Sequence, residues 1–122
     1  MNDRKELIEK ITERMLAYSA NVIHFIDKNP RDLSGQILAK QLLRSATSIG
    51  ANFVEAQAAP SRKDFAHYIS IALKSANETR YWLALLIRTR KGNLQTLESL
   101  QRETVELANL LGSIVKSARK EI

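Results

Sequence analysis

The chain of 122 residues has the length of one domain, and a chain of this size buries about two-thirds of the surface that it exposes when unfolded. It has no cysteine, which excludes disulfides, thiolate metal sites and cysteine nucleophiles. No apolar run comes near the roughly 20 residues that a membrane span needs. We therefore expect one cytoplasmic domain over residues 1–122 with no membrane contact. The net charge of +6 is compatible with a polyanion as partner but is modest for a dedicated nucleic-acid binder.

Two helices are predicted before residue 60. The first, over residues 3–28, should end near Lys28 because a residue that precedes Pro30 is pushed out of the α region. The second covers residues 33–58, where Leu43 and Val54 widen the apolar stripe on one flank. Apolar residues recur every three or four positions in both: Leu7, Ile11, Met15, Tyr18, Val22 and Phe25 in the first, and Leu38, Leu42, Ala46, Ile49, Phe53 and Ala56 in the second.

Two further helices are predicted after Pro60. The third, over residues 61–91, begins with Ser61 as N-cap, which Asp64 answers three residues later, and should close at Gly92. The fourth, over residues 93–120, begins with Asn93 as its cap. Their stripes are Phe65, Ile69, Ala72, Ala76, Leu83 and Ile87, and Leu97, Leu100, Thr104, Ala108, Leu111, Val115 and Ala118.

Helices of this length are each about 40 Å long at 1.5 Å per residue. The predicted links between them are short, so helices that are neighbours in sequence should lie antiparallel. The sequence therefore predicts an all-α fold, an antiparallel up-and-down four-helix bundle.

Three of the helices carry more apolar surface than a single bundle needs. Aligned apolar residues outside the main stripes are more typical of a subunit interface than of isolated surface positions. We therefore predict that the chain associates with itself. The predicted interface residues are Leu16, Ile23, Ile71, Trp82, Leu85, Leu110 and Ile114.

A line of polar residues follows one side of the second helix, beside its apolar stripe. It is either a solvated edge or a partly buried hydrogen-bond network that fixes the register of two helices. The residues are Ser45, Ser48, Asn52 and Glu55, with Ser75 and Glu78 placed similarly on the third helix.

Residues for catalysis or metal binding are not arranged in any recognisable pattern. A di-iron bundle needs Glu-x-x-His pairs on facing helices, but no acidic residue stands three positions before His24, and Asp64 before His67 is better explained as a cap. The sequence also lacks a G-x-S-x-G elbow and a glycine-rich phosphate loop. We therefore expect no metal, no cofactor and no enzymatic activity.

Three segments resemble the bacterial four helix bundle protein family, whose first-described members are encoded by intervening sequences within large-subunit ribosomal RNA genes. They are residues 41–56 (QLLRSATSIGANFVEA), 61–65 (SRKDF) and 71–83 (IALKSANETRYWL). Many relatives have proline where this chain has Gly50, and glycine where it has Ala56, so a kink in the second helix should not be assumed. This difference points to a branch of the family whose link to ribosomal RNA inserts is looser.

The resemblance implies a homopentamer of four-helix bundles with no established enzymatic activity. It also implies kinship with the accessory protein of diversity-generating retroelements, a basic pentameric bundle that binds a reverse transcriptase and nucleic acid. Possible partners are therefore RNA or DNA, or a nucleic-acid-processing protein.

The excess positive charge lies in the middle of the chain, where residues 40–91 contain nine basic and three acidic residues. In an up-and-down bundle, several of these cations would share one end with the close of the first helix. We predict that this basic pole binds nucleic acid or a nucleoprotein, largely without sequence preference. The alternative is a protein-binding scaffold whose charges only solvate its surface. The residues of the pole are Lys28, Arg31, Lys40, Arg44, Arg88, Arg90 and Lys91.

Overall fold

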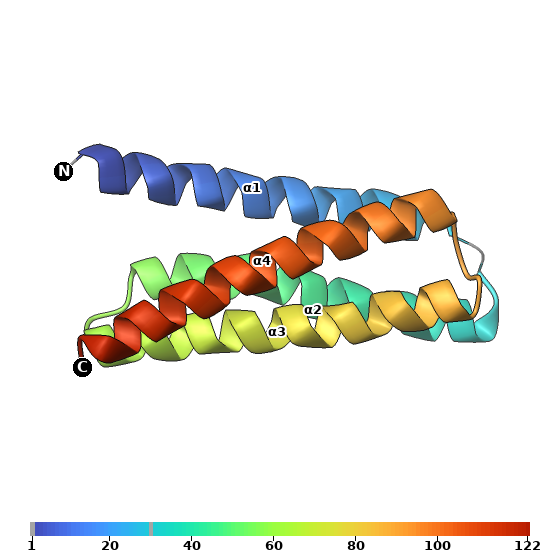
Figure 1. Cartoon of the computed structure of the whole chain (residues 1–122). Coiled ribbons are helices and arrows are strands. Elements are labelled where there is room, and N and C mark those ends of the chain that lie inside the picture. The colour runs from blue at the N-terminus through green and yellow to red at the C-terminus, as the bar shows by residue number, and fades with distance from the viewer. Residues whose placement is uncertain (1, 30) are drawn as a thin grey trace.

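The computed structural model describes residues 2–29 and 31–122 and consists of four long helices in an antiparallel up-and-down arrangement (Figure 1). They are α1 (Asn2–Asp27), α2 (Leu33–Gln57), α3 (Arg62–Arg88) and α4 (Leu94–Lys120). The predicted fold class is confirmed, and no strand occurs in the described residues. None of the helices described is both long and apolar enough to cross a membrane.

Side-chain caps set the starts of three helices. The Ser61 hydroxyl accepts a hydrogen bond from the Asp64 backbone N–H at 3.1 Å and donates one to the Asp64 carboxylate at 2.8 Å. The Asn93 side chain accepts from the Thr96 N–H at 2.9 Å, as the sequence predicts for a cap. Asp32 caps α2 by accepting from the Gly35 N–H at 2.9 Å, a role that the sequence analysis did not assign.

Helix α3 ends three residues before its predicted end at Lys91. The Arg90 N–H donates to the carbonyl of Ile87 at 3.1 Å, and the Lys91 N–H donates to the carbonyl of Leu86 at 3.0 Å. This pattern is a Schellman motif, which requires a left-handed residue just after the helix. Arg90, with a φ of 57°, occupies that position, so the helix closes on an arginine instead of on Gly92.

The core is one continuous cluster along the inner faces of the four helices. All seven predicted stripe residues of α4 are buried. The prediction for Leu7 is wrong, because its side chain is 57 % exposed, and Leu43 and Val54 are also exposed instead of widening the buried stripe. Leu86, which the sequence analysis omitted, is buried.

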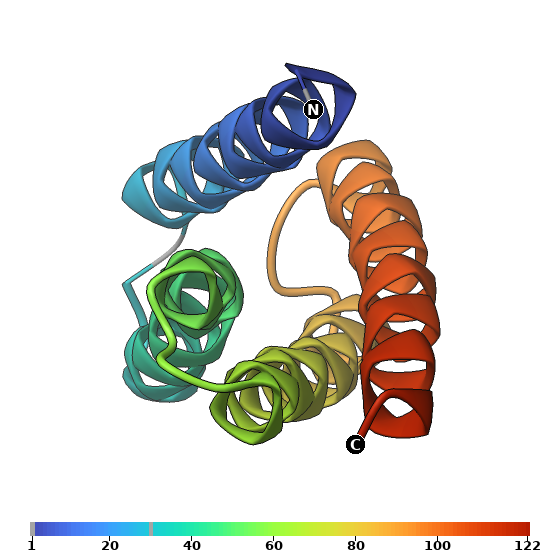
Figure 2. The same ribbon diagram turned by 90° about the vertical axis from the view of Figure 1, so that its left-hand side faces the viewer.

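Helix α1 is the least closely packed of the four. Helices α2 and α3, and α3 and α4, pack closely along their lengths, while α1 packs less closely on α2 and least closely on α4. Figures 1 and 2 show the N-terminal half of α1 standing apart from the other helices, which explains the exposure of Leu7. It does approach α2 closely at Gly50, where an added Cβ would lie 3.2 Å from the Met15 Cβ.

Candidate nucleic-acid interface

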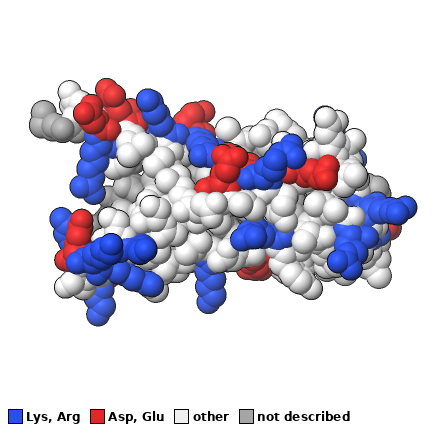
Figure 3. Space-filling view, viewed as in Figure 1, with Lys and Arg blue, Asp and Glu red and all other residues white. Residues whose placement is uncertain are grey.

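The cations of the predicted basic pole come from separate elements that end or begin at one end of the bundle. This end holds the α1–α2 and α3–α4 connections, on the right in Figure 1, and Lys and Arg side chains gather there in the same view of the surface in Figure 3. The structure thus brings together the close of α1 (Lys28), the following loop (Arg31), an early turn of α2 (Lys40) and the end of α3 (Arg88). Arg90 and Lys91 lie in the loop between α3 and α4.

Two of the seven predicted cations are already engaged inside the molecule. Arg44 forms an ion pair with Glu78 across the α2–α3 seam and also donates to the Gln41 side chain at 3.0 Å. Lys91 donates to the Asp32 carboxylate at 2.7 Å, and this bond keeps the pKa of that carboxyl below its usual value. Both cations therefore connect helices or loops, and they contribute less to an external interface than the sequence suggests.

The other five cations are free to meet a partner. Lys28, Arg31, Lys40, Arg88 and Arg90 are exposed, and none of them has a carboxylate partner within the described residues. Exposed cations without internal partners contribute their full charge to the surrounding potential. This end of the molecule can therefore attract a polyanion.

Positive charge also gathers at the opposite end of the bundle. Figure 3 shows Lys and Arg over the starts of α1 and α3 and the end of α4, at the left of the view. Acidic residues accompany the cations there, and Arg62 forms an ion pair with Glu121. The expectation that the charge is concentrated at a single pole is therefore too simple, since exposed cations without an ion pair in the described residues, such as Lys63 and Lys120, occur at this end as well.

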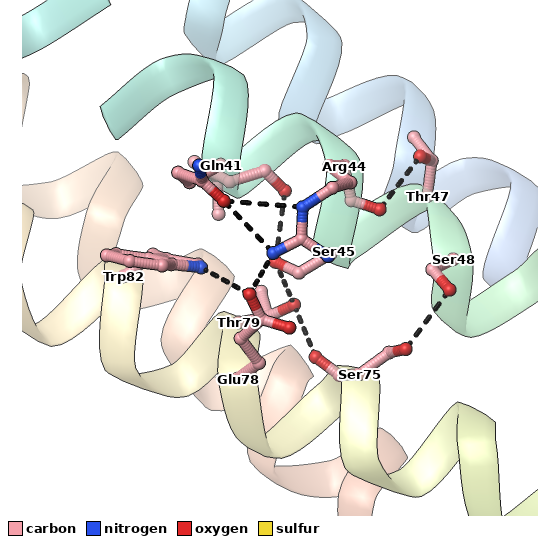
Figure 4. Close-up of polar contacts among 10 residues, drawn as sticks. Gln41, Arg44, Ser45, Thr47, Ser48, Ser75, Glu78, Thr79 and Trp82 are labelled. Atoms are coloured by element: carbon pink, nitrogen blue, oxygen red, sulfur yellow. Dashed lines mark hydrogen bonds and ion pairs between the residues drawn. The ribbon is translucent and has the colours of Figure 1, made fainter. Parts of the chain in front are cut away.

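Hydroxyl groups line the seam between α2 and α3 (Figure 4). The hydroxyl oxygens of Ser45 and Thr79 are 2.8 Å apart, and Ser75 donates to Ser48 at 3.1 Å. Ser45 and Thr79 are buried, and Thr79 is a member that the sequence analysis missed. The seam is thus held by short polar side chains, which allow the two helices to approach closely.

The remaining predicted polar residues extend this seam toward the surface. Asn52 donates to Ser48 at 2.9 Å, and the Trp82 indole donates to Glu78 at 3.1 Å. The bond from Arg44 is the main reason why the pKa of Glu78 is lowered. Glu55 is exposed, and its side chain makes no hydrogen bond or ion pair with any residue that the structure describes, so it stands outside the network.

An exposed aromatic ring lies near the basic pole. The Tyr81 side chain is 62 % exposed, and its ring centroid lies 5.3 Å from that of Trp82 in an edge-on arrangement. Lys74, Tyr81 and Arg88 follow one another at seven-residue intervals and therefore share one face of α3. This heptad spacing was the available signal for a mixed aromatic and basic ridge, which the sequence analysis did not recognise.

The predicted interface residues are not equally exposed in the single chain. Leu16 and Ile23 of α1 are 61 % and 42 % exposed, whereas Ile71, Trp82, Leu85, Leu110 and Ile114 are half-buried. Trp82, Leu110 and Ile114 pack against the core of their own chain. Leu43 and Val54 of α2 are exposed as well, and Leu16 and Val54 line the same groove of about 320 Å³ between α1 and α2.

The described residues contain no group of three or more His, Cys, Asp or Glu side chains that could hold a metal ion. His24 is exposed at the end of α1, and His67 is exposed on α3 with its ring edge-on to Tyr68. Asp64 is occupied by its bonds to Ser61. What the site offers chemically is charge and hydrogen-bond donors for a large anion.

Residues 9–113 match the family described as 23S rRNA-intervening sequence protein. The chain belongs to this family. A solved structure, described as a protein of unknown function from the S23 ribosomal protein family of Bacteroides thetaiotaomicron, is 40 % identical and superposes with a TM-score of 0.79. The likeness covers 87 % of this chain and 98 % of the other. No functionally curated protein matches this member of the family.

Proposed function

We propose that this member of the family is a non-enzymatic, self-associating bundle that binds nucleic acid, or a nucleoprotein, through its basic pole. The observation that carries the proposal is the set of five exposed cations without carboxylate partners at one end of the bundle. The descriptions of the family and of the solved relative both refer to ribosomal material, which agrees with an RNA partner.

Binding of this kind is dominated by phosphate contacts. Each Lys or Arg that neutralises a phosphate releases condensed counterions, so the affinity falls steeply as salt rises. The sequence contains no RNA-recognition motif, so we expect little sequence preference. Tyr81, on the same face of α3 as Arg88, adds a ring on which an unpaired base can stack.

The test is a fluorescence anisotropy titration with labelled RNA and DNA at increasing salt. The pole variant reverses Lys40, Arg88 and Arg90 to Glu, leaving Lys91 in place because it bonds to Asp32. The matched control reverses Lys10, Lys63 and Lys116, which changes the net charge equally at positions away from the pole.

We expect the pole variant to lose at least tenfold in affinity at low salt, and its salt slope to fall by roughly 0.7–0.9 for each phosphate contact removed. The control should keep most of its affinity. Absence of binding at low salt, or equal losses in both variants, would contradict the proposal. A protein partner that the pole variant still captures after nuclease treatment would favour the scaffold alternative.

For self-association we propose the α1–α2 face, where Leu16, Ile23, Leu43 and Val54 are all exposed. The family resemblance favours a pentamer. Light scattering after size exclusion should give a multiple of 13.8 kDa, and the change of Leu16 and Val54 to Glu should reduce it to one chain. A single glutamate at Leu94, which is 55 % exposed at the start of α4, is the control and should leave the assembly intact. A wild-type monomer would refute this part of the proposal.

A further inference from the structure

A wide cleft lies between the end of α1 and the beginning of α4. The two helices touch where the Tyr18 and Thr104 hydroxyls are 2.6 Å apart and where Arg14 donates to Glu103 at 2.8 Å. Between that contact and the basic pole they leave a cleft of about 760 Å³. This volume falls within the range of small-molecule sites, roughly 300–1,000 Å³.

Most residues that line the cleft are polar, and none of them is a carboxylate. His24 lines it from α1. Lys28, just after α1, and Arg102 of α4 also line it, so a positive group stands on each wall. Neither Lys28 nor Arg102 has an acidic partner within the described residues. The carboxylates of Glu103 and Glu106, further along α4, are both bonded to Arg14. A cleft with cations on opposite walls and no neutralising acid favours an anion.

Neutral hydrogen-bonding groups complete the walls. Asn21 on α1 and Gln95 and Ser99 on α4 supply amides and a hydroxyl, which offer both donors and acceptors. Phe25 and Leu100, each 5 % exposed, lie at the base of the cleft. The walls therefore suit a ligand that combines an anionic group with a polar ring system.

The position of the α3–α4 loop fixes the end of the cleft. Gly92, which also lines it, has a φ of 124°, and a Cβ at this residue would lie 2.7 Å from the Phe25 Cζ and 2.9 Å from the Asn29 side-chain oxygen. The loop backbone is thus pressed against the last turn of α1. The cleft is formed by packed elements and is present without a ligand.

We propose that this cleft binds a nucleoside phosphate, with the phosphate between Lys28 and Arg102 and the amides of Asn21 and Gln95 meeting the sugar or base. Arg and Lys are the usual phosphate partners, and the cleft has space for more than a phosphate ion. The nucleoside phosphate is either a free mononucleotide or the phosphorylated end of a strand. In the second case the proposal rests on nucleic-acid binding by the pole, to which Lys28 also belongs.

The test is an amide NMR titration of the intact protein with adenosine, adenosine monophosphate, inorganic phosphate and a short oligonucleotide with or without a terminal phosphate. The cleft variant carries Lys28→Gln and Arg102→Gln. The control carries Lys10→Gln and Lys116→Gln, which remove the same charge from exposed positions outside the cleft. Circular dichroism melting checks that both variants fold.

We expect the monophosphate or the phosphorylated oligonucleotide to shift the amides of residues 21–29 and 92–102, and adenosine to bind at least tenfold more weakly than the monophosphate. The cleft variant should lose at least tenfold in affinity for the phosphorylated ligand while the control keeps it. Amide shifts with the monophosphate would show that a free nucleotide is sufficient for binding. Shifts with the phosphorylated oligonucleotide alone would show that the cleft binds the end of a strand.

The proposal is overturned if no phosphorylated ligand shifts these amides, or if the cleft variant binds as tightly as the control. If the pole variant loses oligonucleotide binding and the cleft variant keeps it, the proposed cleft site is refuted and the proposed function stands. Binding of the monophosphate without binding of any oligonucleotide would refute the proposed function and leave the cleft standing.

Discussion

The seam between α2 and α3 and the seam between α1 and α4 join helices in opposite ways. At α2–α3, short side chains such as Ser45, Ser75 and Thr79 meet directly, and the helices pack closely. At α1–α4 the link depends on a long side chain, Arg14, and on one phenol, Tyr18. Short residues allow backbones to approach, whereas long polar residues attach helices without closing the space between them. The cleft near the basic pole follows from this difference.

The largest expected effect is at the closed seam. The change of Ser45 to Leu adds volume at a site that is 1 % exposed and removes one of the hydrogen-bond partners of Thr79, so we expect the free energy of unfolding to fall by about 3 kcal/mol. Urea unfolding measures it. The same change at Ser19, which lines the open α1–α2 groove, should have an effect of less than about 1 kcal/mol. Equal losses would show that the α2–α3 seam is packed no more closely than the α1–α2 groove.

A smaller loss is expected where the α3–α4 loop meets α1. The change of Gly92 to Ala places a side chain at a φ of 124° and against the Phe25 ring, and we expect it to cost about 2 kcal/mol. Gly112 is the matched control, because a Cβ there meets nothing within 4 Å and α4 is helical throughout. Gly112→Ala should raise the stability by about 0.5–1 kcal/mol in the same urea experiment. A neutral result at Gly92 would contradict the tight contact with α1.

The contact of Tyr18 with Thr104 should contribute about 1 kcal/mol, which Tyr18→Phe removes. Burial raises the pKa of Tyr18 to about 12. The neutral phenol is thus favoured in the folded state, so its contribution is complete below the unfolded pKa of about 10 and is lost as the pH rises through 12. Melting between these pH values should show a steeper decline for the wild type than for the variant. The exposed Tyr81, changed to Phe, should keep that decline.

The smallest effect is expected at the ion pair. The hydrogen bond from Arg14 lowers the pKa of Glu103, so this contribution is present above the ordinary glutamate pKa and is lost as the pH falls through the lower folded value. Because both side chains are about one-third exposed, Glu103→Gln should cost only about 0.5 kcal/mol at neutral pH. Acid titration of the melting temperature should be flatter for this variant than for Glu98→Gln. Identical acid profiles would contradict a contribution from the pair.

The fold was predictable because it rests on local periodicity. The stripe of α4 from Leu97 to Ala118 is buried as its spacing requires, and the caps Ser61 and Asn93 start their helices. Leu7 belongs to an equally regular stripe, but periodicity does not reveal whether a neighbouring helix covers it. Its exposure follows from the position of α1, which is a tertiary property.

The site was less predictable because it depends on which helices pair and in which register. Arg44 and Lys91 were assigned to an external pole, and their ion pairs join residues 34 and 59 positions apart. The α1–α4 cleft joins Lys28 to Arg102, a residue that the sequence analysis left outside the pole. Only the packed structure brings these groups together.

Arg90, which follows α3 in the left-handed backbone conformation, affects which substitutions a screen for stability would select. A residue with a side chain in this conformation costs roughly 1–2 kcal/mol, a penalty that glycine avoids. A library screened for thermal stability alone should therefore return glycine at position 90. Each such winner would lack one positive charge at the pole, so a gain in melting temperature would accompany weaker attraction for an anionic partner. At position 90, thermal stability and binding of an anionic partner therefore favour different residues.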